Sequence, residues 1–396
     1  MRIYLDHNST TPVHSAVVTA VRTALEQQFG NASSVHFFGQ NAKTVVDNAR
    51  ASVATLIGAG PQEIVFTSGG TESDNLAIRG VAESTALTNR RHLITSSIEH
   101  EAVLQTFKAL SKRGWKTTLV PVGQSGIVES EALEAAITDD TALVSIMHAN
   151  NEIGTIQPLA ALAEIAHRHG ALFHTDAVQS VGKLNIAVAD LDIDLLSLSA
   201  HKFYGPKGIG ALWIRRGSRL VSTSTGGKQE RNRRAGTENV PGIAGLGIAS
   251  RLALQNTASD AEHISTLRDK LETKILQTVP GTIVNGDPSK RISNTTNISF
   301  DRVEAESLLI ALDLEGVAVS TGSACSSGTL EPSHVLRAMG FAAHRSQNSI
   351  RFSLGSDNTS EEIDRVIDIL PKLVQKLRNV SRASISPKQQ TVTVGK

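Results

Sequence analysis

Short apolar stretches typical of strands alternate with helical stretches through the middle of the chain, and this alternation is the strongest constraint on its fold. The first apolar run is Ile64–Thr67 and the last is Ala211–Ile214, and most of the runs are separated by apolar residues at helical spacing. Such alternation predicts an α/β fold with a doubly wound, mostly parallel sheet and helices on both faces. The expected strands are 64–67, 92–95, 115–120, 142–147, 171–175, 194–198 and 211–214.

The pattern changes after about residue 255. Long amphipathic helices, expected over 261–279 and 360–377, bracket shorter strands at 298–300, 317–319 and 350–353. We therefore expect a large α/β domain over residues 15–255 and a smaller α+β domain. The smaller domain would consist of residues 1–14 and 256–396, and its last stretch, from Ser384, is polar and unpatterned, as in a frayed tail.

Charge and composition exclude several classes of protein. The 396 residues include 39 Lys and Arg against 38 Asp and Glu, with no long run of like charge, so neither nucleic-acid binding nor a polybasic membrane patch is indicated. No secretory signal or membrane-spanning run is recognisable, and we expect a cytoplasmic protein. The single cysteine, Cys325, rules out an internal disulfide and a cysteine-rich metal cage, so no metal site is expected.

A lysine follows one of the expected strands, in the sequence Ser199-Ala-His-Lys202. A charge at the end of a buried strand is costly unless it is paired or neutralised. Desolvated lysines that lose their proton attack carbonyl carbons and form Schiff bases. The alternative is that Lys202 extends from the strand end into solvent, which is the commoner explanation for an isolated lysine.

Other strand ends carry polar residues with two interpretations each. Ser68–Thr71 lies at a strand-to-helix junction that favours an anion, although Thr71–Asp74 also fits a helix capping box. His100 lies at a similar junction, where a capping or core histidine is the alternative. Asn150–Gly154 follows the expected strand 142–147 and also fits an ordinary turn.

Asp176 ends another apolar strand and needs a cationic partner there. That partner could be a nearby Lys or Arg, or a protonated pyridine nitrogen. In open parallel sheets, ligands bind beyond the carboxyl ends of the strands. A lysine, an aspartate, a stackable histidine and hydroxyls at glycine-rich turns together suit pyridoxal phosphate.

With these residues in place, the chain resembles the cysteine desulfurases of the NifS/IscS-like group. This group belongs to the class V aminotransferase family of fold-type I pyridoxal-phosphate enzymes. The resemblance covers nearly the whole chain and rests on the motifs Phe66–Asp74, His148–Glu152, His174–Gln179, Ser199–Lys202, Arg234–Asn239 and Gly322–Ser327. It implies the fold-type I architecture, a large mostly parallel sheet domain with a smaller α+β domain.

The resemblance also implies how the cofactor ring is held. Lys202 would carry pyridoxal 5′-phosphate as a Schiff base and later move the proton of the substrate Cα. Asp176 would pair with the pyridinium nitrogen, and His100 would stack on the ring and assist proton transfer. Asn151 and Gln179 would form hydrogen bonds near the phenolic oxygen of the ring.

The phosphate and the substrate have their own implied partners. Arg351, with Asn31, would bind the carboxylate of L-cysteine, for which a planar guanidinium is well suited. Thr237 would reach the phosphate from the second subunit of a homodimer. The remaining phosphate contacts would come from Gly70, Thr71, Ser199 and His201.

Cys325 determines the implied reaction. It lies in a run of small polar residues, 320–329, that suits a mobile, exposed loop over about 320–333, although a free cysteine can also be a buried small residue. The resemblance implies that the Cys325 thiolate takes the sulfur of L-cysteine as a persulfide and that L-alanine leaves. The sulfur would pass to an acceptor or iron–sulfur scaffold protein, and transient iron–sulfur ligation at Cys325 stays open.

Three alternatives are weighed against this prediction. One is another class V enzyme, such as an aminotransferase or a cysteine or selenocysteine lyase, which would not need Cys325. Another is a catalytically silent scaffold that binds acceptor proteins. The third is a nucleotide-binding Rossmann enzyme, but the chain lacks the glycine pattern of that fold. Departures from the family pattern, none at a candidate catalytic group, are His7, Ser9, Ala32, Thr321 and a C-terminal tail unlike the scaffold-docking segment of relatives.

Overall fold

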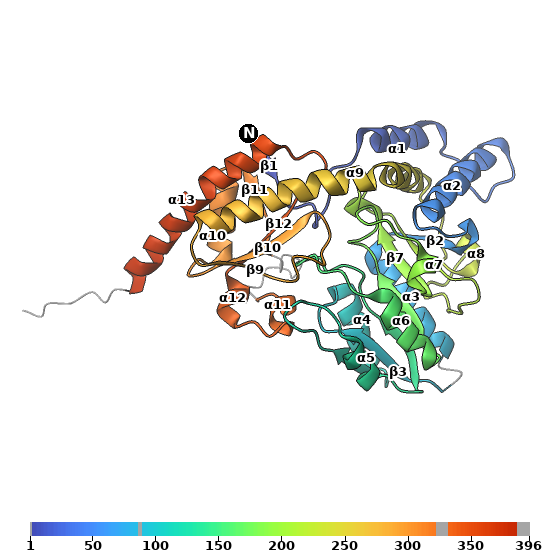
Figure 1. Cartoon of the computed structure of the whole chain (residues 1–396). Helices are drawn as coiled ribbons and strands as arrows, with labels where there is room; N and C mark the ends of the chain where they lie inside the picture. Colours follow the sequence, from blue (N-terminus) through green and yellow to red (C-terminus); the bar gives the residue numbers. More distant parts are fainter. Residues whose placement is uncertain (1, 86–88, 322–331, 386–396) are drawn as a thin grey trace, which may run out of the picture.

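The computed structural model of the chain describes residues 2–85, 89–321 and 332–385. It has a large body built around one central sheet and a smaller body to its side, and the long helix α9 (Val240–Thr278) runs from one to the other (Figure 1). Within the described residues, no helix combines the length and apolar character needed to cross a membrane.

The central sheet has seven strands in the order β2-β8-β7-β6-β5-β3-β4. All neighbouring pairs are parallel except those of β8, which runs antiparallel to both β2 and β7. The predicted doubly wound, mostly parallel sheet is therefore confirmed. The strands are β2 (Ile64–Thr67), β3 (His92–Ser96), β4 (Lys116–Val120), β5 (Thr141–Ser145), β6 (Leu172–Asp176), β7 (Leu195–Ser199) and β8 (Gly210–Ile214).

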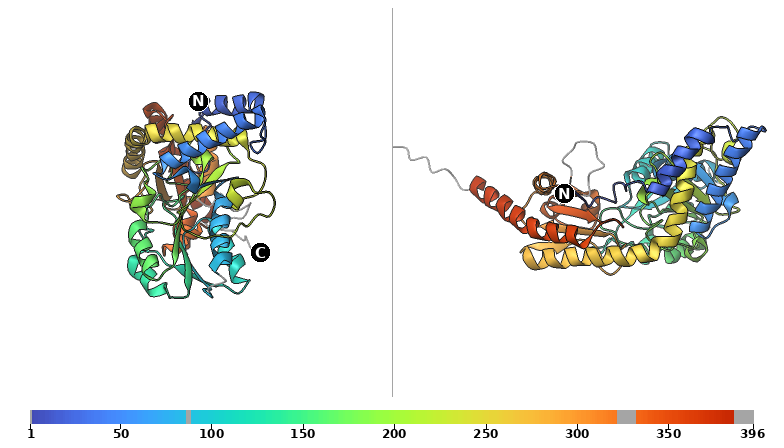
Figure 2. Two further views of the ribbon diagram at one scale, coloured as in Figure 1. Left: turned by 90° about the vertical axis from the view of Figure 1, so that its right-hand side faces the viewer. Right: turned by 90° about the horizontal axis from the view of Figure 1, so that it is seen from above.

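Helices cover both faces of this sheet, because its inner strands are buried along their whole length. In Figure 2 the sheet lies between α3 and α4 on one side and α5 and α6 on the other. The helices of the large body are α1 (Ser15–Gln27), α2 (Phe37–Leu56), α3 (Gly70–Thr85), α4 (Glu101–Ser111), α5 (Ser130–Ala136), α6 (Leu159–Arg168), α7 (Val188–Leu191) and α8 (Gln229–Asn232). The 3-10 turns η1 (Pro61–Glu63) and η3 (Ala200–Lys202) also belong to the described part of this body.

The helix that we expected from residue 261 begins much earlier, at Val240, and is 39 residues long. The side chain of Asn239 caps its first turn by accepting the Gly242 N–H at 3.1 Å. Because glycine has a low helix propensity, the glycines near the start of α9 made this extension unexpected. The same glycines let α1 and α2 pack closely on α9. A Cβ atom at Gly247 would lie 2.7 Å from Ala49 Cα. The expected boundary at 255 thus falls inside this helix.

The smaller body joins both ends of the described chain. Strand β1 (Ile3–Tyr4) pairs in parallel with β11 (Val317–Ala318), as we expected of the N-terminal strand. An antiparallel sheet of order β12-β10-β9 lies beside it and shares a separate apolar core with α9, α10 and α13. The remaining elements are β9 (Thr282–Val284), β10 (Thr295–Phe300), α10 (Ala305–Leu314), α11 (His334–Ala338), α12 (Ala343–Gln347), β12 (Ser349–Ser353) and α13 (Ser360–Ile385).

Candidate active site

A pocket lies where the carboxyl ends of the central strands meet the smaller body. The connections after β2, β3, β5, β6 and β7 each contribute to its wall, as expected for a parallel sheet. Ten of the predicted site residues line it together, namely Gly70, Thr71, His100, Asn151, Asp176, Gln179, Ser199, His201, Lys202 and Arg351.

Three predicted site residues lie elsewhere or outside the described chain. Asn31 is in the turn between α1 and α2, where its Oδ1 accepts the Ser33 N–H at 2.9 Å. Thr237 borders a separate hollow beside Ser68 and Arg234. Cys325 and most of the loop expected over 320–333 lie outside the described residues.

Lys202 points inward, not into solvent. Its Nζ donates to two backbone carbonyls, Asn8 O at 2.6 Å and Ser9 O at 2.9 Å. These carbonyls belong to the segment that follows β1, so the lysine at the end of β7 contacts the smaller body. The interpretation of Lys202 as a solvent-seeking lysine is wrong.

Two buried carboxyl groups line the pocket close to each other. Asp176, at the end of β6, is 6% exposed, and its Oδ1 accepts the Val178 N–H at 2.9 Å. Burial raises the pKa of Asp176, against the lowering effect of His100 and Lys202. Burial and the neighbouring Asp176 charge raise the pKa of Asp74 well above its usual range, and Asp74 Oδ1 has no hydrogen-bond partner among the described residues. The pair therefore holds one negative charge more readily than two.

An uncharged histidine supports this pair from within the sheet. His174 forms hydrogen bonds with the hydroxyls of Ser145 (2.8 Å) and Ser197 (2.9 Å) on the neighbouring strands. Burial lowers the pKa of His174 to about 3, so its ring is neutral at ordinary pH. His174 Nε2 lies 3.7 Å from Asp74 Oδ1. Because the imidazole is neutral, the contact is not an ion pair.

His100 combines the two interpretations that the sequence left open. Its Nδ1 accepts the Ala102 N–H at 3.1 Å and so caps α4, while its ring lines the pocket. The capping bond fixes the ring's orientation. Its neighbour Glu99 is wholly buried, and burial raises the pKa of Glu99 to about 8.

One end of the pocket lies at the N-terminus of α3. A Cβ atom at Gly70 would lie 2.7 Å from Val178 Cγ2, so only glycine allows this close approach. Ser199 and His201 line the same end, and burial and nearby lysines lower the pKa of His201 to about 4. Free N–H groups of the first turn and the helix dipole favour an anion here.

The capping box suggested for Thr71–Asp74 is absent, because α3 begins at Gly70 and Thr71 is already helical. Glu72 instead reaches back and accepts the Ser68 N–H at 2.7 Å. Arg234 pairs with Glu72 at 2.8 Å, and these bonds hold the pKa of Glu72 below its usual value against the opposing effect of burial.

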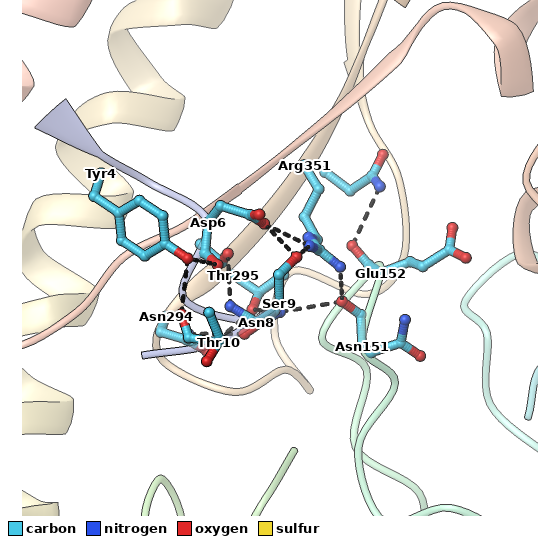
Figure 3. A network of polar contacts seen from close by, with 12 residues as sticks. Tyr4, Asp6, Asn8, Ser9, Thr10, Asn151, Glu152, Asn294, Thr295 and Arg351 are labelled. Carbon is cyan, nitrogen blue, oxygen red and sulfur yellow. Dashed lines mark hydrogen bonds and ion pairs between the residues drawn. The ribbon is translucent and has the colours of Figure 1, made fainter. Parts of the chain in front are cut away.

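Arg351, on β12, is held by three oxygen atoms (Figure 3). Its Nη2 donates to Asp6 Oδ1 at 2.6 Å and Ser9 Oγ at 2.8 Å, and its Nη1 donates to Asn151 O at 2.9 Å. The side chain is 4% exposed. The guanidinium is therefore oriented before any ligand arrives, at the lip where both bodies meet.

Six pocket residues were not predicted from the sequence: the polar residues Asn8, Ser9 and Asp74 and the apolar residues Met147, Ala149 and Val178. Asn8 is 1% exposed and joins the two bodies, since its Nδ2 donates to Thr295 Oγ1 at 2.8 Å and its O accepts from Gln179 Nε2 at 2.9 Å. The only available signal was the polar run Asp6–Thr11 between two apolar stretches, which also fits a simple turn.

The residues present fit pyridoxal phosphate. The close approach at Gly70 leaves a backbone cradle for a phosphate, and buried Asp176 can face a protonated ring nitrogen. The orphaned Asp74 Oδ1 marks a polar wall that a ligand or water can satisfy. Within the described residues, no group of three or more His, Cys, Asp or Glu side chains is arranged to hold a metal ion.

Comparison with known proteins agrees with this geometry. The family model described as aminotransferase class-V matches residues 3–366. The chain belongs to the class V aminotransferase family. A protein of Dictyoglomus turgidum named cysteine desulfurase IscS is 48% identical over 379 residues, which cover 96% of each chain. A protein of the same name from Methanosarcina thermophila is 49% identical and covers 98% of this chain and 95% of its own.

Solved structures give the same result. One titled NIFS-LIKE PROTEIN superposes with a TM-score of 0.89 at 38% identity and covers 95% of this chain and 100% of its own. Another, titled SspA in complex with cysteine, has a TM-score of 0.79 at 37% identity and covers 91% of this chain and 100% of its own. The predicted NifS/IscS-like membership and the fold-type I architecture are thus confirmed, and enzymes of this family depend on pyridoxal phosphate.

Proposed function

We propose that this protein is a cysteine desulfurase that moves the sulfur of L-cysteine to Cys325 and releases L-alanine. The observation that carries the proposal is the single pocket in which Lys202, Asp176 and Arg351 meet, from both bodies of the chain. It is supported by close relatives of that name at 48–49% identity over nearly the full length. The alternative of a nucleotide-binding Rossmann enzyme does not fit membership of the class V aminotransferase family.

Different residues of the pocket would hold different parts of the cofactor. Lys202 would carry it as a Schiff base, Asp176 would face its ring nitrogen, and His100 would stack on the ring. Asn151 and Gln179 would contact the ring's phenolic oxygen. Gly70, Thr71, Ser199 and His201 would hold the phosphate. When bound, the cofactor supplies an electron-withdrawing ring that stabilises negative charge developing on the substrate.

Substrate binding and proton movement use the chain's own groups. Arg351 holds the substrate carboxylate, and its orientation by Asp6 means that little side-chain freedom is lost on binding. Lys202 Nζ takes the proton from the substrate Cα, and His100 assists at the ring face. The strand-end position of both residues keeps them on a rigid frame.

The sulfur step is balanced without an external oxidant. The Cys325 thiolate attacks the sulfur of L-cysteine, so an S–S bond forms while the Cβ–S bond of the substrate breaks. The sulfur that moves is oxidised to the sulfane level, and the substrate carbon is reduced to the methyl group of L-alanine. The sulfur then passes to an acceptor or iron–sulfur scaffold protein, and Cys325 could ligate an iron–sulfur cluster transiently.

We propose that a second copy of the chain completes a homodimer. Thr237 and Asn31 of one copy would then lie at the pocket of the other copy, across the interface. Apolar side chains exposed around the α1–α2 connection support this, because Phe29 and Phe37 are 68% and 71% exposed. We also propose a cytoplasmic location and the division into residues 15–255 and the remainder, with α9 shared between the two.

Mass spectrometry of the protein after incubation with L-cysteine tests the proposal. We expect one added sulfur, about 32 Da, on the peptide that contains Cys325 and one alanine released per sulfur transferred. The variant Cys325→Ala should bind the cofactor, shown by its visible absorbance, and form neither product. Continued formation of alanine from L-cysteine by Cys325→Ala would overturn the proposal in favour of another class V lyase.

A further inference from the structure

Lys183 lies beside the pocket and has no part in the proposed chemistry. It follows β6, four residues beyond Gln179, and its Nζ donates to Gln179 Oε1 at 2.7 Å and to Asn8 Oδ1 at 3.1 Å. In the described part of the chain, its ammonium has no carboxylate partner. Lys183, held by two amide oxygens, thus places a second amino group near Lys202.

The contact with Lys183 determines which end of the Gln179 amide faces its neighbours. A protonated lysine offers only donors, so the atom it meets at 2.7 Å is the amide oxygen. The other end, Nε2, donates one hydrogen to Asn8 O at 2.9 Å. Its second hydrogen is available for a ligand, because Gln179 lines the pocket. The amide can therefore offer the pocket a donor but not an acceptor.

We propose that Lys183 is a positioning residue that locks the Gln179 amide with its N–H toward the pocket, so that the site favours a deprotonated oxygen on the ring it binds. This inference rests on the proposed function, because the ring oxygen in question is that of pyridoxal phosphate. Asn8 is the shared support, since it meets Lys183 through Oδ1 and Lys202 through O.

The charge of Lys183 acts in the same direction as the hydrogen bond. A nearby cation and a donor to the ring oxygen both disfavour a further proton on the bound cofactor. The charged and titratable groups that share this environment are Lys202, Arg351, His7, His201 and, across a small cavity, Asp260. Burial together with the Lys202 and Arg351 charges lowers the pKa of Lys183 well below its usual value. Its influence should therefore be lost at a lower pH than that of a solvent-exposed lysine.

A pH titration of the visible absorbance of the purified holoenzyme tests this role without measuring turnover. In Lys183→Met we expect the pH midpoint of the cofactor's colour change to rise by about one unit, because a donor and a positive charge are both lost. Lys183→Arg should return it toward the wild-type value. Lys207→Met removes a charge from an exposed lysine near His201 and serves as the matched control, with an unchanged midpoint.

Gln179→Leu shows whether Lys183 acts through the amide. It should raise the midpoint as well, and the double variant should shift it by less than the sum of the two, because both changes remove the same contact. Should Lys183→Met not fold, Lys183→Gln carries the same expectation. A wild-type midpoint in these Lys183 variants would overturn the role of Lys183, whereas a wild-type protein without any absorbance from bound pyridoxal phosphate would overturn the proposed function instead.

Discussion

The amino nitrogen of Lys202 lies 2.6 Å from the carbonyl oxygen of Asn8. Lys202 lies in the turn η3 directly after the central strand β7, and Asn8 follows β1 of the smaller body, so the contact spans 194 positions of sequence. Gln179 donates to the same carbonyl at 2.9 Å. The candidate catalytic lysine is therefore placed by the docking of the two bodies as well as by its own strand.

Arg351→Lys should weaken substrate binding although the positive charge is kept. A lysine cannot reach Asp6, Ser9 and Asn151 together, so the head group loses its fixed orientation. We expect kcat/KM for L-cysteine to fall about 30- to 150-fold, as for the loss of about 2–3 kcal/mol of charged hydrogen bonds. Initial rates of alanine formation give this value.

Arg291→Lys is the control for that change, since Arg291 is equally enclosed (4% exposed) but pairs with Glu272. It should reduce stability and leave KM for L-cysteine as in the wild type. An unchanged kcat/KM in Arg351→Lys would contradict the assignment of Arg351 to the substrate carboxylate.

The two buried carboxyl groups of the pocket should respond differently to amide substitution. Burial and Asp176 raise the pKa of Asp74 well above the usual range, so Asp74→Asn replaces a carboxyl group whose charged form is disfavoured. We expect it to bind pyridoxal phosphate within about twofold of the wild type. Asp176→Asn should bind at least about tenfold more weakly, a loss of about 1.4 kcal/mol. Spectral titration of the apoenzyme measures both, and equal losses would contradict the division of roles.

Glu99 should make stability depend on pH. Burial raises the pKa of Glu99 from 4.5 to about 8, so the folded protein holds this proton more tightly than the unfolded chain. The resulting stabilisation is complete below about pH 4.5 and is lost as the pH rises through 8. Between pH 5 and about 8.5, we expect the free energy of unfolding of Glu99→Gln to rise relative to that of the wild type, by on the order of 4 kcal/mol.

Urea unfolding at a series of pH values measures this difference. Glu131→Gln, on the exposed surface of α5, is the control and should follow the wild type throughout. Parallel curves for Glu99→Gln and the wild type would show that the Glu99 proton does not contribute.

Gly247→Ala should destabilise the protein although alanine favours helices. Its Cβ would lie 2.7 Å from both Ala49 Cα and Ala49 Cβ, so α9 and α2 would have to separate. We expect a loss of about 1–3 kcal/mol in the free energy of unfolding, measured by urea denaturation. Gly123→Ala, where a Cβ finds only Ser125 Oγ at 3.9 Å, should change stability little. A stabilised Gly247→Ala would contradict the close packing.

The sequence predicted the sheet and most of the pocket because their signals are local. Buried strands are short apolar runs, and a reactive side chain placed directly after one of them, such as Lys202 or Asp176, must lie at the ligand-binding edge of a parallel sheet. His100 was predicted as a pocket residue in the same way, although capping of the following helix alone would also have explained a histidine at this position.

The remaining features depend on contacts between distant parts of the chain. Asn8 meets Thr295 across 287 positions, and nothing in the run Asp6–Thr11 shows that it enters the pocket. The start of α9 was placed too late because its glycines suit close packing against α2 and oppose helix formation locally. The capping box expected at Thr71–Asp74 is absent because α3 already begins at Gly70, so that Thr71 lies inside the helix.

The order of these segments along the chain has a consequence for biosynthesis. Asn8 and Ser9 are synthesised before the central sheet, whereas β12 with Arg351, which binds the same segment, follows some 340 residues later. At ordinary rates of translation this interval lasts roughly 20–70 s. The central sheet can form during that time, but the pocket wall that holds Arg351 beside Ser9 is finished only after β12 has been made. A ligand that needs this wall would therefore bind only after β12 has joined the segment that follows β1.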